Sequence, residues 1–452
     1  MTQRLVVIGG DAAGMSAAAT AKRGAGDDLE VVVLERTSWT SYSACGIPYW
    51  ASGDVDGPEG LVARSPEQHR ERGLDVRIGA EATAIDTTAG TVHFRSFDDG
   101  AEHTLGYDHL LVTTGAEPIR PSVPGADARG VHGVQTLDDG CRLLDSLTTG
   151  DPKRAVVVGA GYIGIEMAEA CVQRGLETTV IDKAPEPMGT LDADLGRQVH
   201  DAMEQMNIDV ITDTEVEEFE TEGARVRGVV AGGQTYAADV VIFGLGVRPR
   251  TQLASAAGLP LGVFGGIRVE PSMRVPGLPG VWAAGDCVEV WDRLREEFTY
   301  IPLGTHANKQ GRVAGLNLSG GHAVFAGVVG TAVTKVCNLE VARTGLSQTQ
   351  ADTAGRDAVS ATIETTTRAG YFPGAQPMTV RLTAEPHSGR LLGAQIIGKE
   401  GSAIRIDTCA TALWTRMCAQ DLVDLDLAYA PPFSSTWDPI QVAARSLLGE
   451  LR

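Results

Sequence analysis

The sequence lacks the patterns that mark a metal site or a disulfide framework. Its seven cysteines include no CxxC pair and no regular spacing, and its nine histidines show no HExxH-type or Cys/His spacing. An odd number of irregularly spaced cysteines is typical of a reducing compartment. We therefore expect a cytoplasmic protein without a metal, in which most thiols are small buried apolar residues.

Long apolar runs and an excess of positive charge are also missing. No stretch could span a bilayer, and the first ten residues lead into a strand and a glycine loop rather than a signal peptide. The net charge of -20 argues against nucleic acid or an anionic membrane as partner. With 43% hydrophobic residues and 452 residues in all, we expect a globular protein of two to three domains.

Two segments have the pattern of a nucleotide-binding unit. An apolar run at 4–8 opens onto the glycine loop GGDAAG, and a helix-prone segment and a second apolar strand at 29–34 follow. The same order returns around GAGYIG, which begins 150 residues later. This strand–turn–helix–strand pattern predicts two doubly wound parallel sheets that arose by internal duplication.

The two glycine loops differ in how well they fit the dinucleotide fingerprint. The second fits fully, and Asp182 lies where an acid should bind the ribose. In the first loop Gly9 and Gly14 match, but Asp11 takes the place of the middle glycine. Glu35 ends the following strand at the ribose position. Two such loops in one chain indicate electron transfer between two dinucleotides.

The hydrophobic pattern of the sequence changes beyond residue 327. Strand-like alternation occurs at 332–336, 360–366, 378–382 and 391–397, and a helical stretch at 404–417 follows. This pattern predicts a separate α+β domain with an antiparallel sheet.

Several motifs in order give the chain a specific resemblance. GGDAAG, TTGAEP, GAGYIGIE, FGLGVRP, AAGDC, LGTHANKQGRVAG and YAPPFSSTWDP extend over nearly the full length. The chain resembles the pyridine nucleotide–disulfide oxidoreductase family. That resemblance implies an α/β fold with two Rossmann-like lobes: an FAD-binding domain at 1–115 and 250–325 and an NAD(P)H-binding domain at 116–249. It also implies a C-terminal α+β dimerisation domain at 326–452 and a homodimer.

The resemblance places FAD on the first fingerprint and the nicotinamide nucleotide on the second. Tyr162 would gate the nicotinamide pocket, with Glu166 beside it. Asp182 favours NADH because a carboxylate repels a 2′-phosphate, while the adjacent Lys183 leaves NADPH open. The cofactor-binding residues implied are Gly9, Gly10, Asp11, Ala12, Gly14, Glu35, Arg36, Ser43, Ala82, Thr114, Gly115, Asp286, Gly304, Thr305, Ala307, Gly159, Gly161, Tyr162, Ile163, Gly164, Glu166, Asp182, Lys183 and Gly246.

The redox candidate is Cys45 in SYSACGIPYW. The positions five residues away are Thr40 and Trp50, so this segment cannot form an internal redox disulfide. The signature is similar to that of the family's single-cysteine branch. We expect Cys45 to lie at the start of a helix, where the pKa of a thiol falls, and to attack a disulfide as a thiolate.

Other positions favour one member of that branch. Ala12 occupies the place where family peroxidases and water-forming oxidases carry a histidine. Tyr429 and Tyr371 resemble two tyrosines of the coenzyme A disulfide reductases, where a tyrosine of the second subunit donates a proton to the leaving thiolate. The implied substrate-binding residues are Ser16, Thr20, Arg23 and Ser41. Thr20 and Ala44 depart from the glutamine and asparagine of some members.

The predicted function is NAD(P)H-dependent reduction of a low-molecular-weight disulfide, with coenzyme A disulfide as the first candidate. Three alternatives remain open: an NADH oxidase in which Cys45 cycles through a sulfenic acid, a persulfide or polysulfide reductase, and a redox-sensing flavoprotein. Replacing Cys45 would separate the last from the enzymes, because a sensor could still be reduced by NADH.

Overall fold

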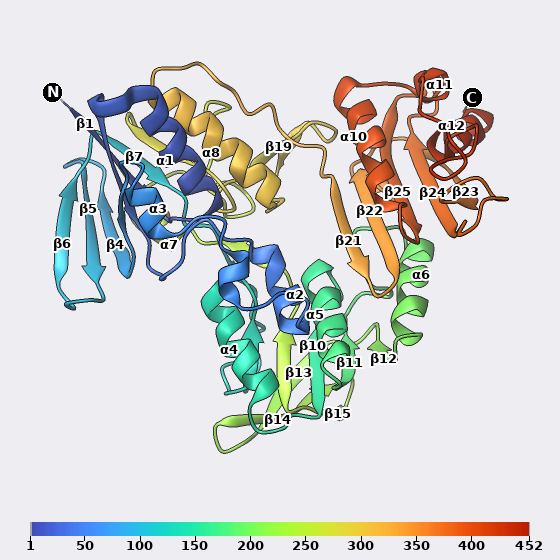
Figure 1. Cartoon of the computed structure of the whole chain (residues 1–452), viewed down its shortest axis with the longest axis horizontal. Coiled ribbons are helices and arrows are strands. Elements are labelled where there is room, and N and C mark those ends of the chain that lie inside the picture. Colours follow the sequence, from blue (N-terminus) through green and yellow to red (C-terminus); the bar gives the residue numbers. More distant parts are fainter. Residues whose placement is uncertain (1, 452) are drawn as a thin grey trace.

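The computed structural model describes residues 2–451, which form two parallel-sheet lobes and a C-terminal unit with an antiparallel sheet (Figure 1). This arrangement confirms the predicted fold class. Within the described residues, no helix has both the length and the apolar character needed to cross a bilayer.

The first lobe has a five-stranded parallel sheet in the order β18-β7-β1-β2-β3. Its central strands consist largely of buried valine, leucine and isoleucine, as expected for a sheet covered on both faces. Its strands are β1 (Gln3–Ile8), β2 (Leu29–Leu34), β3 (Asp75–Arg77), β7 (His109–Val112) and β18 (Val281–Ala283). Because β18 follows the second lobe in sequence, two separate segments build this lobe.

Helices α1 (Ala12–Ala25) and α8 (Gly304–Leu318) lie side by side on the first lobe (Figure 1). Glycines allow their close approach: a Cβ at Gly311 would lie 2.2 Å from the carbonyl oxygen of Ala13, and one at Gly315 would lie 2.5 Å from that of Ala17. This close packing fixes the N-termini of the two helices relative to each other.

The second lobe repeats the parallel design in the order β12-β11-β10-β16-β9. Its strands are β9 (Val131–Gly133), β10 (Arg154–Val158), β11 (Glu177–Ile181), β12 (Ile208–Ile211) and β16 (Val240–Phe243). Its helices are α4 (Leu137–Thr148), α5 (Tyr162–Gln173) and α6 (Ala193–Glu204), and an antiparallel sheet joins β13 (Val216–Glu222), β14 (Arg225–Ala231) and β15 (Gln234–Ala237). The antiparallel pair β8 (Ala116–Pro118) and β17 (Val247–Pro249) carries the chain between the lobes.

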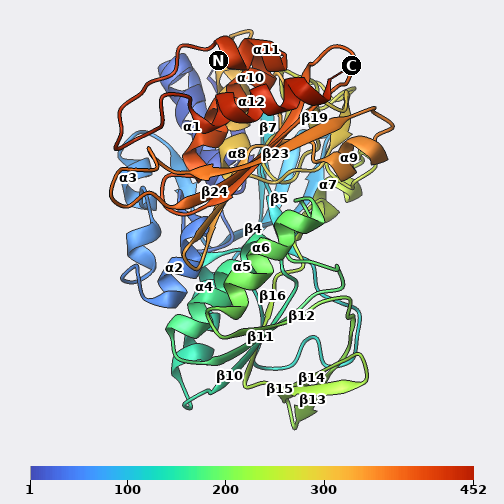
Figure 2. The ribbon, with the colours of Figure 1, turned by 90° about the vertical axis from the view of Figure 1, so that its right-hand side faces the viewer.

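The C-terminal unit has a five-stranded antiparallel sheet in the order β21-β22-β25-β24-β23. Its elements are β21 (Ala332–Val336), β22 (Leu339–Gly345), α9 (Gln348–Thr353), β23 (Val359–Thr366), β24 (Pro377–Ala384), β25 (Leu391–Gly398), α10 (Ile406–Thr415), α11 (Ala419–Asp424) and α12 (Pro439–Glu450). Figure 2 shows this sheet above the second lobe with α6 between them. There Arg381 of β24 binds Asp192, the residue just before α6, at 3.1 Å.

The remaining elements are short. They are η1 (Gly26–Asp28), η2 (Ala44–Gly46), α2 (Ile47–Ser52), η3 (Pro58–Leu61), α3 (Pro66–Arg70), β4 (Ala80–Asp86), β5 (Thr91–Ser96), β6 (Glu102–Gly106), α7 (Gln252–Ala256), β19 (Val290–Asp292), β20 (Glu297–Thr299) and η4 (Ala403–Arg405).

Helix α2 belongs to the first lobe by sequence but packs on the second. Ile47 and Trp50 join the hydrophobic core of the second lobe. A Cβ at Gly140 of α4 would lie 2.7 Å from the ring of Trp50, so the absent side chain makes room for that ring. The segment just before α2 is thereby held where the lobes meet.

Candidate active site

Cys45 lies in the turn η2, which leads directly into α2. Backbone bonds fix the approach to this turn: Ser43 N–H donates to Leu61 O at 2.9 Å, and Gly46 N–H donates to Ser43 O at 2.9 Å. Cys45 is exposed, and all seven cysteines are free thiols. Apart from Cys141, the other five are buried or half-buried. The thiol is therefore at the start of a helix and open to a reactant.

The electrostatics at Cys45 correct one expectation. The helix start predicted a lowered thiol pKa. Although the residue has exposed surface, the protein around it partly desolvates the thiol and raises the pKa of Cys45, and the carboxylates of Glu166 and Asp286 act in the same direction. Helix α2 is only six residues long, so its dipole is weak against two negative charges. The resting protein favours the neutral thiol.

The first glycine loop forms a cradle that side chains would fill. Gly9 has a φ of +105°, and a Cβ there would lie 2.2 Å from Thr113 O. A Cβ at Gly14 would lie 2.0 Å from Gly9 O. The N–H of Gly10 donates to the Glu35 carboxylate at 2.7 Å. This hydrogen bond holds the acid that is predicted to bind the ribose next to the loop. These contacts are what a bound dinucleotide requires of the fingerprint.

Asp11 precedes α1 but does not cap it. Its carboxylate accepts a hydrogen bond from Tyr42 N–H at 3.0 Å, in the segment that leads to Cys45. The first N–H groups of α1 are therefore not occupied by this side chain and can face a phosphate. Burial, with Glu35 and Asp286 nearby, raises the pKa of Asp11 to about 7.

Asp286 and Gln310 complete a polar surface that fits FAD. Burial raises the pKa of Asp286 to about 6. Gln310 of α8 accepts from Gly285 N–H at 2.7 Å, while its Nε2 is buried and has no partner within residues 2–451. An unpaired buried donor and a carboxylate beside the glycine cradle match the polar groups of a flavin nucleotide.

The second glycine loop is built in the same way. A Cβ at Gly164 would lie 1.9 Å from Gly159 O, whereas one at Gly161 would meet only Gly244 O, at 3.7 Å. At Gly161 the protein thus leaves room for a side chain, at the place where a pyrophosphate would approach. The Asp182 carboxylate accepts from the N–H groups of Ala160 and Ala184, the latter at 2.7 Å.

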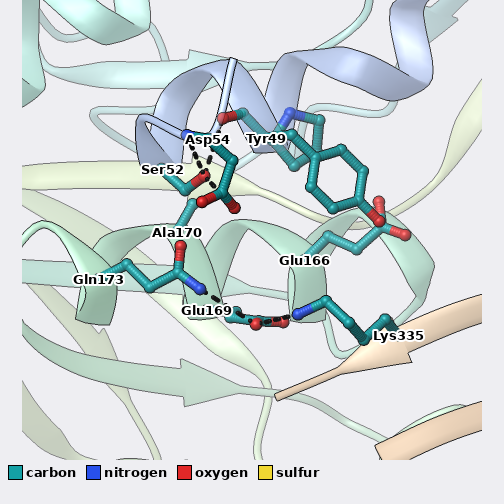
Figure 3. A pocket seen from close by; sticks show the side chains of 9 residues that line it. Tyr49, Ser52, Asp54, Glu166, Glu169, Ala170, Gln173 and Lys335 are labelled. Carbon is teal, nitrogen blue, oxygen red and sulfur yellow. Dashed lines mark hydrogen bonds and ion pairs between the residues drawn. The ribbon is translucent and has the colours of Figure 1, made fainter. Parts of the chain in front are cut away.

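Glu166 lies on α5 beside a small cavity between α2, α5 and β21 (Figure 3). The Thr334 hydroxyl donates to its carboxylate at 2.6 Å. Figure 3 shows the ring of Tyr49 directed toward Glu166, and Lys335 directed toward Glu169. Tyr49, Glu169, Thr334 and Lys335 were not among the predicted site residues. Tyr49 stands in the redox motif itself, but no local pattern could link β21 to α5.

The predicted substrate-binding residues form hydrogen bonds with other side chains of the chain. On α1, Arg23 donates to Thr20 at 3.3 Å, and Ser16 donates to Asn308 of α8 at 2.8 Å. Ser41 lies 2.9 Å from Nε2 of His69. Burial, with Arg64 and Arg72, lowers the pKa of His69 to about 4, so this ring is uncharged at neutral pH. Sequence reasoning missed Asn308 and His69.

The other predicted cofactor residues line the same edges of the two sheets. Thr114 donates to Arg250 O at 2.6 Å where the chain returns from the second lobe, and Gly115 and Gly246 have positive φ. Ala307 is buried one turn into α8, behind Gly304 and Thr305. Ala12, Tyr162 and Ile163 lie in or next to the loops, and Arg36, Ser43 and Lys183 are exposed. Ala82 lies instead on β4, in the separate antiparallel sheet of β4, β5 and β6.

The two predicted tyrosines belong to the C-terminal unit, Tyr371 between β23 and β24 and Tyr429 between α11 and α12. Tyr371 and Tyr429 are 77% and 50% exposed on the C-terminal unit, and a hydrogen bond to Tyr429 raises the pKa of Tyr371. Figures 1 and 2 both place α11, which precedes Tyr429, far from α2. Two exposed aromatic residues of this kind are typical of an interaction surface.

Comparison with known proteins gives a consistent set of similarities. The family model described as pyridine nucleotide-disulphide oxidoreductase matches residues 3–311, and its dimerisation-domain model matches residues 331–439. The chain is 36% identical to an NADH oxidase of Methanocaldococcus jannaschii, and it is 35% identical to an NAD(P)H coenzyme A polysulfide/persulfide reductase of Pyrococcus horikoshii. Each alignment covers 99% of both chains. The crystal structure of reduced Bacillus anthracis CoADR-RHD superposes with a TM-score of 0.96 and 32% identity, covering 99% of this chain and 80% of that one.

Proposed function

Because the chain belongs to the pyridine nucleotide-disulphide oxidoreductase family, we propose that it reduces a low-molecular-weight disulfide through Cys45, with coenzyme A disulfide as the preferred substrate. It is an oxidoreductase of the type that uses FAD and a reduced nicotinamide nucleotide. The observation that carries the proposal is the exposed Cys45 at the junction of the two nucleotide lobes, with no second cysteine in its segment.

The chemistry of a lone thiol defines the reaction. The Cys45 thiolate attacks one sulfur of the disulfide RSSR, which forms Cys45–S–S–R and expels RS⁻. Two electrons then cleave this mixed disulfide, release the second RS⁻ and restore the Cys45 thiolate, and each RS⁻ takes up one proton. FAD, held by the first glycine loop, would supply these two electrons at the expense of the reduced nicotinamide nucleotide.

The glycine loops and their acids hold the two nucleotides. Glu35 and Asp286 would accept hydrogen bonds from FAD hydroxyls, and the N–H groups at the start of α1 would bind its phosphates; the hydrogen bond from Gly10 N–H to Glu35, which joins this acid to the glycine loop, supports this assignment. Asp182 at the second loop supports NADH over NADPH, since its negative charge opposes a 2′-phosphate.

The substrate would lie along α1 and meet a second subunit. Ser16, Thr20 and Arg23 follow one another at helical spacing, and Arg23 can bind a phosphate. We infer a homodimer in which Tyr429 of the partner subunit donates a proton to the leaving thiolate, with Tyr371 of the partner subunit beside it. The match to a dimerisation domain and the exposure of both tyrosines support this arrangement. Seven free cysteines support a cytoplasmic location.

A persulfide or polysulfide reductase is the second candidate, favoured by the 35% identity to a relative with that name. The same thiol could take sulfane sulfur in place of a disulfide. An NADH oxidase is supported by a 36% identical relative, but Ala12 occupies the first loop where a histidine would assist peroxide chemistry. A purely sensing role would leave the exposed Cys45 without a reaction.

Anaerobic NADH consumption by the FAD-loaded protein tests the substrate class. With coenzyme A disulfide as the only oxidant, we expect rapid turnover that falls by at least about 1000-fold in Cys45→Ser. Cys141→Ser, which removes the other exposed thiol, should keep the native rate. Rapid consumption only with a persulfide, or only with oxygen, would replace coenzyme A disulfide by that oxidant.

A further inference from the structure

His69 on α3 is a buried histidine for which the proposed reaction has no use. It is 1% exposed, and its Nε2 lies 2.9 Å from the hydroxyl of Ser41. The other ring nitrogen, Nδ1, is buried and has no partner within residues 2–451. Ser41 opens the redox segment, by which we mean residues 41–46 around Cys45. The ring of His69 is therefore placed for its contact with this segment.

The hydrogen bond between His69 and Ser41 has a definite direction. Burial, with Arg64 and Arg72, lowers the pKa of His69 to about 4, so the ring is neutral at pH 7 and carries one N–H. A proton on Nδ1 would be a buried donor without an acceptor, which is rarer in proteins than an unused lone pair. We therefore assign the proton to Nε2, from which His69 donates to Ser41 Oγ.

Ser41 has a backbone conformation that needs support. Its φ of +50° lies in the left-handed region, where a residue with a Cβ is strained. Such a conformation persists only where the surroundings fix it. Two backbone bonds do so, from Ser41 N–H to Gly10 O at 3.3 Å and from Ala63 N–H to Ser41 O at 2.8 Å. The bond from His69 holds the side chain, so three separate contacts restrain this residue.

The chain from Ser41 leads directly to the thiol. Tyr42 N–H donates to a carboxylate of the first glycine loop at 3.0 Å, and Ser43 N–H donates to the last residue of η3 at 2.9 Å. Cys45 follows in η2. A change of φ at Ser41 would rotate the following chain relative to both anchors, because φ is one of only two free backbone torsions of a residue. Cys45 would then be displaced from the place where the lobes meet.

We propose that His69 is a positioning residue, which keeps Ser41 at positive φ through its hydroxyl and thereby holds Cys45 in the orientation that reacts. The effect passes through the backbone of residues 41–45 and requires no contact between His69 and the thiol. A displacement of a reacting atom by about 1 Å can lower a rate by about 100-fold. The proposal rests on the proposed role of Cys45, but it does not depend on which oxidant the thiol meets.

Amide hydrogen exchange of the FAD-loaded protein without substrate tests the restraint itself. In peptides that cover the redox segment, we expect exchange to be about tenfold faster in His69→Phe, which keeps a planar ring but cannot donate. Exchange should stay slow in His69→Gln, because its amide nitrogen can donate from the place of Nε2. The peptide of the second glycine loop, residues 159–164, is an internal control that should not change.

Two changes at Ser41 separate the strained backbone from the loss of the hydroxyl. Ser41→Ala keeps the strained φ but loses the group that His69 holds, so its redox segment should exchange as fast as that of His69→Phe. In Ser41→Gly the positive φ costs little, and exchange should be clearly slower than in Ser41→Ala. Adding His69→Phe to Ser41→Gly should have no further effect on exchange.

Steady-state kinetics tests the effect on the reaction, with coenzyme A disulfide or whichever oxidant the native protein consumes. We expect His69→Phe to lower kcat about tenfold or more and to leave the KM for NADH at its native value, because the nicotinamide nucleotide binds to the other lobe. His69→Gln should recover most of the lost kcat.

Native exchange in His69→Phe would overturn the proposal, and so would fast exchange combined with a native kcat. Equal exchange in Ser41→Gly and Ser41→Ala would also contradict it, because the backbone conformation would then not matter. If His69→Phe does not fold, Ser41→Ala decides in its place, since this position is half-buried. A native protein that does not consume coenzyme A disulfide, with the exchange pattern intact, would reject the proposed substrate and leave the role of His69 standing.

Discussion

The acids around Cys45 oppose the negative charge that the reaction needs on its sulfur. The reaction requires a thiolate, yet Glu166, Asp286 and Asp11 all raise the pKa of the thiol. Two of these acids are themselves hard to ionise, because burial raises the pKa of Asp11 to about 7 and that of Asp286 to about 6. Protonation of these acids would remove their negative charge and lower the pKa of the thiol.

Asp11 gives a prediction about stability and pH. Its pKa rises on folding from 3.8 to about 7, so the folded chain binds the proton more tightly than the unfolded chain. Stability from the neutral carboxyl is full below about pH 4 and is lost as the pH rises toward 7. In FAD-free protein, the melting temperature of Asp11→Asn relative to the native chain should therefore increase over this range and stay constant above it.

Thermal unfolding from pH 4 to 9 measures this difference. Asn keeps an oxygen that can accept from Tyr42 N–H, so the tether of the redox segment is retained. A difference between the two proteins that does not change with pH would contradict the raised pKa.

At the scale of elements, the two glycine loops separate structural from ligand-binding glycines. A Cβ at Gly164 would lie 1.9 Å from Gly159 O, so Ala at this position must distort the start of α5. A Cβ at Gly161 meets only Gly244 O, at 3.7 Å, and Gly161 has the ordinary φ of -81°. The folded loop can therefore accommodate a methyl group at this position, but we expect that group to occupy the space of the nucleotide's pyrophosphate.

We predict that Gly161→Ala folds, keeps its FAD and raises the KM for NADH about tenfold or more. Gly164→Ala should instead lower the melting temperature. Steady-state kinetics and thermal unfolding of both variants check this. An unchanged KM in Gly161→Ala would place the pyrophosphate elsewhere.

These elements also show what the sequence can and cannot predict. Each glycine loop lies between a strand and a helix that are contiguous in sequence, so local patterns were sufficient to place Gly9, Glu35, Gly159 and Asp182. Thr334 and Glu166 are 168 positions apart, and only the packing of β21 on α5 joins them. The wrong direction for the pKa of Cys45 has the same origin, since the helix argument was local, whereas the burial of the thiol and the charges near it depend on the packing of distant segments.

At the scale of the whole molecule, the proposed site needs two chains. Tyr371 and Tyr429 are exposed on the C-terminal unit, and α11, which precedes Tyr429, lies far from α2, which follows Cys45 (Figures 1 and 2). A surface of this kind, on a domain that matches a dimerisation model, fits a symmetric dimer in which each tyrosine pair serves the other chain.

Mixed dimers test whether Tyr429 acts across the interface. A dimer of one Cys45→Ser chain and one Tyr429→Phe chain should keep about half of the native disulfide reductase activity, because one of its two sites retains both groups. If Tyr429 acts within its own chain, both sites are defective and the activity is about half that of the Tyr429→Phe homodimer, since only one site still carries Cys45. A dimer of Cys45→Ser with a native chain serves as the reference for one working site.

The most direct test of the central claim is to identify the adduct on Cys45. The FAD-loaded protein, with its thiols reduced and its flavin oxidised, is treated with coenzyme A disulfide without NADH. The remaining thiols are then alkylated, and the peptides are analysed by mass spectrometry. We predict one coenzyme A moiety on the peptide that contains Cys45, none on that of Cys141, and its release as free coenzyme A when NADH is added before alkylation. An unmodified Cys45, or an adduct that NADH does not remove, would contradict the proposed mechanism.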